Sequence, residues 1–289
     1  MSLSLRSPSR YTNAPLTEDE LLHRAPSIFA TEAHESRSQR FCPIPTIDVL
    51  RALSKEGFHA VGAKQTRSRD ESKRDFTKHM IRLRRFDDVS RTKSSDSVCE
   101  IILKNANDGT SAYDLLSGMF REICLNGLIA CTDKIDAVKV RHSGNAIENV
   151  IEGTYTVLSQ TERVLAAPDI WSGIQLSRDA AKALAAESHM IRFEGAETPI
   201  THQQLLIPRR REDTKTDLWT VFNVIQENTI KGGLSAMRAT QDVRGRTQLR
   251  RVTTRPVNGI DQDVKLNRAL WSLSERMASI LSSQHLAVA

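Results

Sequence analysis

The stretch FTKHMIRLRRF, residues 76–86, decides how the first half of the chain folds. Its apolar residues Ile81 and Leu83 alternate with cations and with Met80. A period of two sends successive side chains to opposite faces of a β-strand. We therefore expect a strand with one apolar face and one cationic face. The cations that share the second face are Lys78, Arg82 and Arg84.

The segments on either side complete an α+β pattern. Apolar runs predict two further strands, at residues 58–69 and 98–105. Thr46 as N-cap and Gly57 as closing residue predict a short helix before them. After the third strand, apolar residues recur at spacings of three and four, which predicts a helix over residues 110–127. They are Tyr113, Leu116, Phe120, Ile123 and Cys124. The predicted order is a helix followed by β-β-β-α.

The fold class predicted for the whole chain is α+β, in three regions. Residues 1–40 are rich in Ser, Arg and Pro and are expected to be a flexible N-terminal segment. Residues 41–165 form the core domain, and residues 166–289 a mostly helical C-terminal region with a basic loop at 231–255. The elements expected inside these regions are a short helix at 18–23, an additional hairpin over 128–142, and helices over 145–165, 178–191, 202–207, 217–230 and 260–281.

The composition is that of a folded protein with a basic balance. Of the 289 residues 39% are hydrophobic, and the formal net charge is +6. A basic balance attracts polyanions. The start MSLSLRSPSR lacks the apolar run of a secretion signal, and no stretch approaches 18 consecutive apolar residues. The four cysteines form no C-x-x-C pair. We expect a cytoplasmic protein with no membrane partner.

Motifs for common catalytic centres are missing from the sequence. It contains no G-x-x-x-x-G-K-[ST] loop for nucleotides, no G-x-G-x-x-G and no G-x-S-x-G. We therefore expect no enzyme activity, no cofactor and no metal. One alternative stays open, a Mg²⁺-dependent nuclease that uses Glu100 beside Lys104 in E-I-I-L-K. The spacing of four rather than two puts these side chains too far apart to share one ion.

Clustered cations are the strongest functional signal. Residues 231–255 hold seven of them against one acid, Asp242. Seven like charges in one segment repel one another unless an anion arrives, although solvated surface charge is the competing interpretation. The predicted nucleic-acid-binding residues are Lys64, Arg67, Arg69, Lys78, Arg82, Arg84, Arg141, Lys231, Arg250, Arg251, Arg255, Lys265 and Arg268.

Aromatic residues make up only 5% of the chain. Proteins that hold single strands by stacking usually use aromatic side chains for it. Trp219, Phe222 and Trp271 fall on helical stripes and are expected in the core. Nucleic acid would therefore be bound mainly through backbone phosphates.

Several motifs resemble a family of uncharacterised proteins carried by phages, plasmids and other bacterial mobile elements. The longest runs from Thr254-Arg255-Pro256-Val257-Asn258-Gly259 to Leu270-Trp271. Others are Asp108-Gly109-Thr110, Arg141-His142-Ser143-Gly144-Asn145, Gln226-Glu227-Asn228 and Gly232-Gly233-Leu234. The helix followed by β-β-β-α is also similar, more weakly, to single-strand annealing proteins of the recombination-mediator type. The resemblance implies work on DNA without ATP.

The function expected from these observations is ATP-independent binding and annealing of single-stranded DNA, by a homo-oligomer that could form a ring. Two alternatives remain. One is a non-enzymatic module that binds a host-defence or plasmid-maintenance protein, and the other is the Mg²⁺-dependent nuclease.

Overall fold

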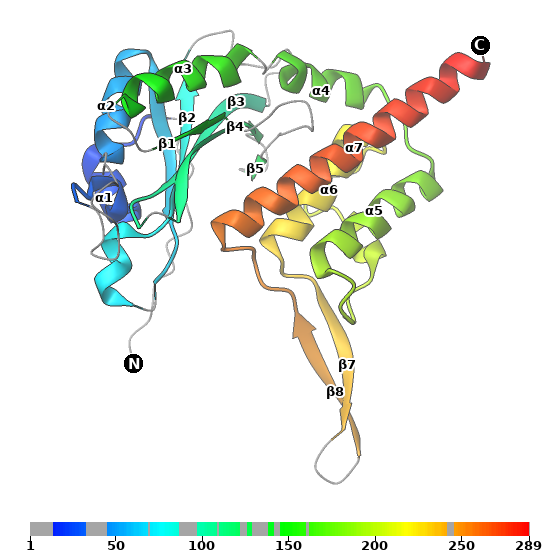
Figure 1. Cartoon of the computed structure of the whole chain (residues 1–289). Helices are drawn as coiled ribbons and strands as arrows, with labels where there is room; N and C mark the ends of the chain where they lie inside the picture. The colour runs from blue at the N-terminus through cyan, green and yellow to red at the C-terminus, as the bar shows by residue number, and fades with distance from the viewer. Residues whose placement is uncertain are drawn as a thin grey trace. The chain divides into compact units, whose positions relative to one another are not determined.

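A computed structural model describes most of the chain, which divides into two compact units, residues 1–165 and 166–289. Figure 1 shows the path from blue at the N-terminus to red at the C-terminus. The fold class is α+β, as the sequence predicts. The structure describes residues 14–32, 45–68, 70–86, 97–108, 110–121, 126–128, 138–141, 145–159, 162–241 and 246–288.

The first unit is built on an antiparallel sheet of six strands. Strands β1 to β4 form a meander in which each strand pairs with the next, and both β5 and β6 pair with β4. The strands are β1 (Phe58–Gln65), β2 (His79–Arg85), β3 (Ser97–Ala106), β4 (Ser111–Arg121), β5 (Asn126–Leu128) and β6 (Val138–Val140). The predicted strand at 76–86 is confirmed as β2.

One face of this sheet carries the core of the unit. Helices α2 (Thr46–Lys55) and α3 (Ala146–Ser159) pack on the face to which Ile81 and Leu83 point. A Cβ atom on Gly153 of α3 would lie 2.8 Å from side-chain atoms of Leu115 and Val138. The glycine therefore allows α3 to approach strands β4 and β6 closely.

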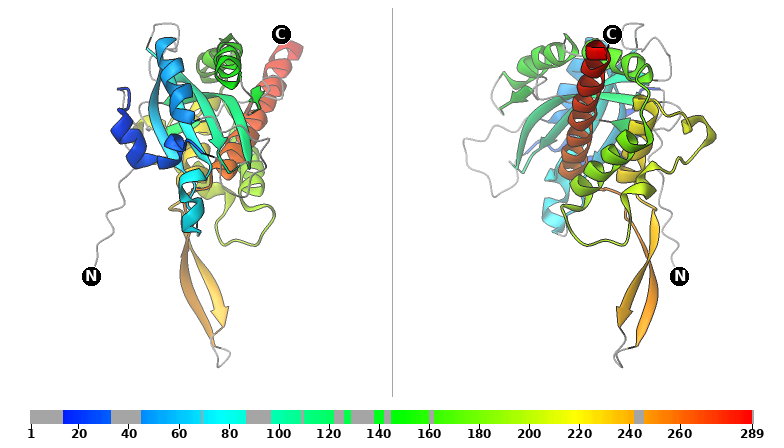
Figure 2. Two further views of the ribbon diagram at one scale, coloured as in Figure 1. Left: turned by 60° about the vertical axis from the view of Figure 1, so that its left-hand side comes forward. Right: turned by 90° about the vertical axis from the view of Figure 1, so that its right-hand side faces the viewer.

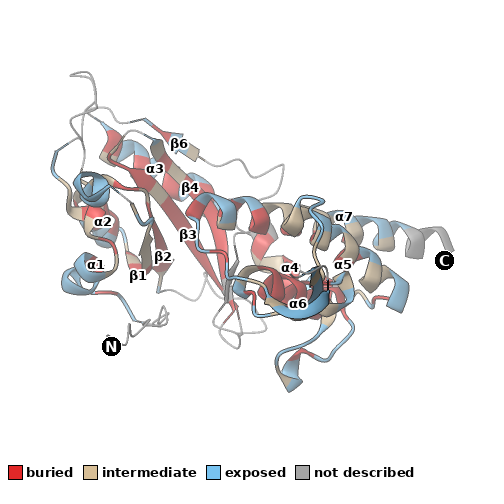
Figure 3. Ribbon diagram, turned by 90° about the horizontal axis from the view of Figure 1, so that it is seen from below, coloured by how far each residue is buried: buried red, intermediate tan, exposed pale blue. Residues whose placement is uncertain are grey.

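The predicted helix at 110–127 is wrong, because residues Ser111–Arg121 form strand β4. Tyr113 and Leu115 point to the helical face, while Leu116 on the other face is also buried. Figure 3 shows β3 and β4 buried (red) along much of their length. A strand buried on both faces has no alternation of apolar and polar residues, and its apolar spacing can imitate a helix. The helix–β-β-β-α order behind the weaker resemblance is thus not the order found.

The predicted hairpin over 128–142 is also wrong, because β5 and β6 each pair with β4 and not with one another. The helix expected over 145–165 is two helices, α3 and α4 (Glu162–Ser172).

Part of the N-terminal segment is folded: the short helix expected at 18–23 is found, and the order around it extends further than the sequence predicts. Residues 14–32 include α1 (Glu18–Arg24) and the 3₁₀ turn η1 (Pro26–Phe29). Thr17 and Glu20 form a capping box at the start of α1. Leu21 and Ile28 are buried in the core of the sheet unit. Burial of these apolar side chains offsets the entropy lost when the segment is ordered. A further 3₁₀ turn, η2 (Glu71–Phe76), precedes β2.

The second unit is helical with one β-ribbon. Its core contains a cluster of aromatic rings. The ring centroid of Trp171 in α4 lies 4.6 Å from that of Trp271 and 5.4 Å from that of Phe222. The prediction that Trp219, Phe222 and Trp271 are core residues is confirmed. The elements are the end of α4, α5 (Arg178–Phe193), η4 (His202–Leu206), η5 (Arg211–Asp213), α6 (Leu218–Lys231), β7 (Ser235–Gln241), β8 (Thr247–Thr253) and α7 (Ile260–Val288).

Among the described residues, no helix combines sufficient length with sufficient apolar character to cross a bilayer.

Candidate nucleic-acid interface

An exposed cationic feature of the second unit is the two-stranded antiparallel ribbon of β7 and β8. The ribbon leaves the helices of its unit and extends alone, as Figures 1 and 2 show from three directions. Nearly all its residues are exposed or half-buried, including Met237 at 54% and Leu249 at 66%. Side chains with so little contact contribute little to a core. These side chains are therefore accessible to a ligand.

The register of the ribbon places two arginines opposite one another. Arg238 on β7 pairs with Arg250 on β8, and Met237 pairs with Arg251. Cβ atoms of residues directly opposite lie about 5 Å apart, and like charges there destabilise the pairing. Among the described residues neither Arg238 nor Arg250 has a carboxylate partner, and Arg238 makes one long hydrogen bond, 3.4 Å, to the carbonyl of Glu197. Two guanidinium groups thus share one exposed face, and no described residue gives either of them a counter-charge.

The base of the ribbon is fixed by backbone contacts. The amide of Gly233 donates to the carbonyl of Thr254 over 2.9 Å, and that of Thr254 donates to Leu234 over 2.8 Å. A Cβ on Gly232, whose φ is +64°, would lie 2.7 Å from the carbonyl of Arg255. Glycine is therefore required where the two strands leave the helices.

Two arginines tie this base to the helices. Arg192 of α5 donates to the carbonyls of Thr229 and Arg255, each over 3.1 Å, and burial lowers its pKa from the ordinary value. Arg209 donates to Asn228 Oδ1 over 2.7 Å and to the carbonyl of Gly232. These guanidinium groups satisfy carbonyls that the ends of α6 and β8 leave open. The ribbon is therefore held at its root by arginines that do not themselves belong to it.

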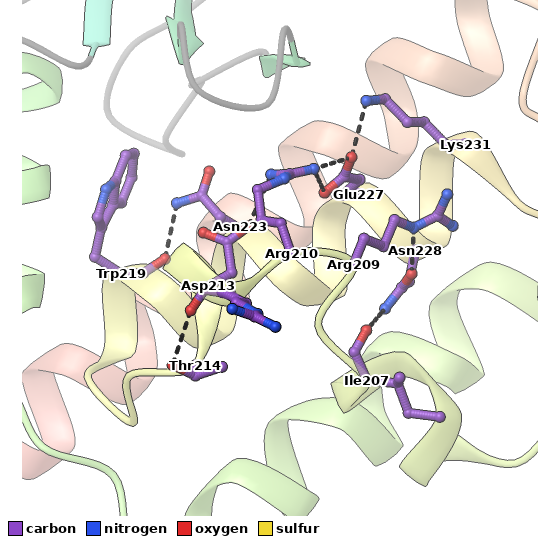
Figure 4. Close-up of polar contacts among 11 residues, drawn as sticks. Ile207, Arg209, Arg210, Asp213, Thr214, Trp219, Asn223, Glu227, Asn228 and Lys231 are labelled. Carbon is purple, nitrogen blue, oxygen red and sulfur yellow. Dashed lines mark hydrogen bonds and ion pairs between the residues drawn. The ribbon is translucent and has the colours of Figure 1, made fainter.

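A buried carboxylate, Glu227 of α6, organises the neighbouring cations (Figure 4). It accepts from Arg210 over 2.6 Å and from Lys231 over 2.8 Å, and Arg210 also pairs with Asp213 over 2.7 Å. Burial alone would raise the pKa of Glu227, but the hydrogen bonds from Lys231 and Arg210 lower it overall. The prediction that Lys231 contacts phosphate is not supported, because its ammonium group is paired with this carboxylate.

The arginines of the sheet are arranged differently from the expected cationic face. Arg84 pairs with Glu100 Oε1 over 2.7 Å, and Arg82 pairs with the other carboxylate oxygen. The side chains of both arginines and of Glu100 are buried. The expectation that Arg82 and Arg84 contact phosphates is therefore wrong, because a carboxylate on the next strand already occupies both guanidinium groups.

Both residues on which the nuclease alternative depends are engaged in ion pairs within the sheet. Glu100 is occupied by two arginines, and Lys104 pairs with Asp114 on β4 over 2.8 Å. In the part of the chain that the structure describes, no group of three or more His, Cys, Asp or Glu side chains could hold a metal ion.

The remaining predicted cations are scattered over both units. Arg67 and Arg141 are exposed, Lys64 and Lys78 are half-buried near strand ends, and Arg69 lies outside the described residues. Lys265 pairs with Glu194 over 2.8 Å rather than with Asp261, and this hydrogen bond lowers the pKa of Glu194. Arg268 is half-buried on α7. Arg250, Arg251 and Arg255 lie on or beside the ribbon, with Arg250 and Arg251 on opposite faces of β8.

Sequence reasoning did not select Arg238, Thr240 or Gln248. These residues share the Arg250 face of the ribbon, because Thr240 pairs with Gln248 two positions from the arginine pair. The register of the hairpin could have identified them. Once Arg238 is placed opposite Arg250, moving two residues along each strand toward the turn places Thr240 opposite Gln248. The basic stretch predicted only a loop or an open hairpin.

Comparison with known proteins places the chain in a family. Residues 33–271 match the model of a domain of unknown function, DUF932. The chain is 46% identical over 267 residues to the UPF0380 protein YfjQ of Escherichia coli strain K12, covering 92% of this chain and 93% of that protein. It is 45% identical to the UPF0380 protein YafZ of the same strain, with the same coverage. No solved structure matches the chain. The chain therefore belongs to the DUF932 family.

Proposed function

We propose that this protein binds nucleic acid through backbone phosphates, without a nucleotide cofactor, and that the β7–β8 ribbon is the contact surface. The observation that carries the proposal is the cross-strand pair of Arg238 and Arg250, exposed and without a carboxylate partner among the described residues. Such a pair costs stability in the unbound protein. A bound phosphate turns that repulsion into two charge-assisted hydrogen bonds.

Arginine fits this role better than lysine. Its planar guanidinium binds a phosphate through two parallel hydrogen bonds and is always charged. All four cations in the described part of the ribbon and its turn are arginines, namely Arg238, Arg246, Arg250 and Arg251. Work on the DNA of a mobile genetic element is the setting that suits this function.

Annealing of single strands is a separate activity, and the sheet face no longer supports it because Arg82 and Arg84 bind Glu100. It is tested directly by mixing complementary strands with the protein and no ATP, while the size of the oligomer is measured in the same sample. Faster pairing than in the absence of protein supports annealing, and an unchanged rate removes it.

The binding test is fluorescence anisotropy with a labelled oligonucleotide at two salt concentrations. We expect micromolar affinity, which falls by about 10² between 50 and 200 mM salt if about four phosphates are contacted. Replacing Arg250→Gln and Arg251→Gln together should weaken binding and reduce the slope of log affinity against log salt by about 1.8.

The matched control is Arg178→Gln with Arg276→Gln. Both arginines are exposed, belong to the same unit and lie outside the ribbon. Because two arginines are replaced in each variant, the change in net charge is the same. We expect the control to keep the wild-type salt slope. Equal weakening in the control, or no binding to any oligonucleotide at low salt, contradicts the proposal.

A further inference from the structure

We infer that the ribbon enters the major groove of B-form DNA. Its Arg238–Arg250 face contacts phosphates on unrelated sequences and turns toward the base edges at a preferred site. This inference rests on the proposed function and names the form of nucleic acid that the same surface takes. It concerns one face of the ribbon, because alternate residues of a strand point to opposite faces.

The two faces of the ribbon differ in chemistry. One carries the pairs Arg238–Arg250 and Thr240–Gln248. The other carries Met237 opposite Arg251 and Ala239 opposite Leu249. The first face therefore holds hydrogen-bonding side chains at its two pairs nearest the tip, with Ala236 opposite Val252 at its base. The second face has the apolar side chains Met237, Ala239 and Leu249 in its middle, between the polar pairs Ser235–Thr253 and Gln241–Thr247.

The first face matches what a major groove displays. Arginine binds the O6 and N7 acceptors of guanine through two hydrogen bonds, and glutamine binds the N6 and N7 of adenine in the same way. Threonine can bond with either base. Arg238, Arg250 and Gln248 are thus the residue types that distinguish one base pair from another.

The dimensions of the ribbon favour the major groove. That groove is about 12 Å wide and admits a two-stranded ribbon, whereas the minor groove is about 6 Å wide. Each strand has seven residues. At about 3.4 Å per residue, such a strand follows roughly six base pairs.

Other nucleic acids fit the ribbon less well. Residues 235–253 contain no Phe, Tyr or Trp, so no ring is available to stack on the bases of a single strand. The major groove of A-form RNA is too deep and narrow for side chains to read. Double-stranded DNA is the form that both the width and the side chains of the ribbon suit.

The root of the ribbon supports this use. Gly232 and the carbonyl contacts made by Arg192 and Arg209 fix the direction in which the strands leave the helices. A fixed direction reduces the ordering cost of inserting the ribbon into a groove.

The experiment measures binding of the full chain to a 20-base-pair DNA duplex, to one of its strands and to an RNA duplex of the same sequence. We expect the DNA duplex to bind at least about ten-fold more tightly than either competitor. Methyl green, which occupies the major groove, should displace the protein, and distamycin, which occupies the minor groove, should not. Equal or tighter binding of the single strand, or displacement by distamycin alone, overturns the inference while leaving the proposed function standing.

Specific readout is tested with a site selected from random duplexes. The double variant Arg238→Lys with Arg250→Lys keeps the charge but removes the bidentate hydrogen bonds that arginine makes to a base. Its affinity for the selected site should fall by roughly ten-fold or more, whereas its affinity for unrelated duplexes should not change. Arg251→Gln should weaken binding to every sequence equally. Polyglutamate is the probe for an acidic protein partner, and binding to it as tight as to DNA would overturn the inference. Failure to bind any nucleic acid would overturn the proposed function itself.

Discussion

The arginines of the sheet and those of the ribbon look alike in sequence and differ in what balances their charge. Arg82 and Arg84 lie on β2 beside Glu100 of β3, which pairs with both. Arg238 and Arg250 lie opposite each other on the ribbon, with no carboxylate of the described residues on either. A cation with its own counter-charge serves the fold, whereas a cation without one can serve a ligand. The position of the nearest carboxylate, and not the number of cations, separates the two regions.

The largest expected effect comes from removing the counter-charge of the sheet. Glu100→Gln leaves two buried guanidinium groups facing a neutral amide, which should cost about 3–5 kcal/mol of unfolding free energy. Urea unfolding at neutral pH measures the loss. Glu71→Gln, an exposed carboxylate of the same unit, is the control and should be near neutral. A loss below about 1 kcal/mol in Glu100→Gln would mean that the sheet arginines are solvated and would restore them as candidate DNA contacts.

The sequence predicts part of this contrast and misses the rest for identifiable reasons. The alternation in residues 76–86 correctly predicts strand β2 and its two faces. Glu100 lies 16 and 18 positions from the arginines that it binds, so its role depends on the pairing register of two strands. Strand β4 is missed because both its faces are buried, which removes the period of two. The cross-strand arginine pair is missed because only the register of the ribbon creates it.

A second prediction concerns Glu227, which gives Arg210 and Lys231 a counter-charge that no described residue gives to Arg238 or Arg250. Its pKa is lowered from the ordinary 4.5, so the stability that it adds is complete above that pH and is lost as the pH falls through the lowered pKa. Glu227→Gln should cost about 3 kcal/mol at pH 7, and its difference from the wild type should shrink on acidification. Urea unfolding in steps from about pH 7 to about pH 3.5 checks both. A difference that stays constant with pH would show that packing, not charge, holds this residue.

A third prediction tests the root of the ribbon without changing any charge. Gly232→Ala places a Cβ 2.7 Å from the carbonyl of Arg255 and should cost about 2 kcal/mol, together with part of the DNA affinity. Gly233→Ala is the matched control. Its φ of +86° is also strained, but no atom lies within 4 Å of the added Cβ. Thermal unfolding and anisotropy of the two variants should rank Gly232→Ala as the more damaging, and the reverse order would remove the close approach as the reason for glycine.

The smallest expected change in stability comes from giving the ribbon its own counter-charge. Arg250→Glu puts a carboxylate opposite Arg238 and should stabilise the ribbon by about 0.5 kcal/mol, while DNA affinity falls by more than about ten-fold. Arg251→Glu faces Met237 and should lose affinity without gaining stability. Thermal unfolding and DNA titration of both variants separate these effects. If Arg250→Glu binds DNA as tightly as the wild type does, the ribbon arginines are solvated surface charges and do not contact DNA.

The separation of the ribbon from the core has an evolutionary consequence. Exchanging the half-buried Thr240 or the exposed Gln248 leaves the aromatic core around Trp271 untouched, so selection can alter the ribbon tip at little cost in stability. Under the proposed function, relatives at 45% identity can share one scaffold and differ in the nucleic acid that the ribbon contacts. Among such relatives we expect the preferred DNA sequence to change through a few substitutions on one face of the ribbon. We expect Gly232 and the two arginines that hold the root, Arg192 and Arg209, to be retained.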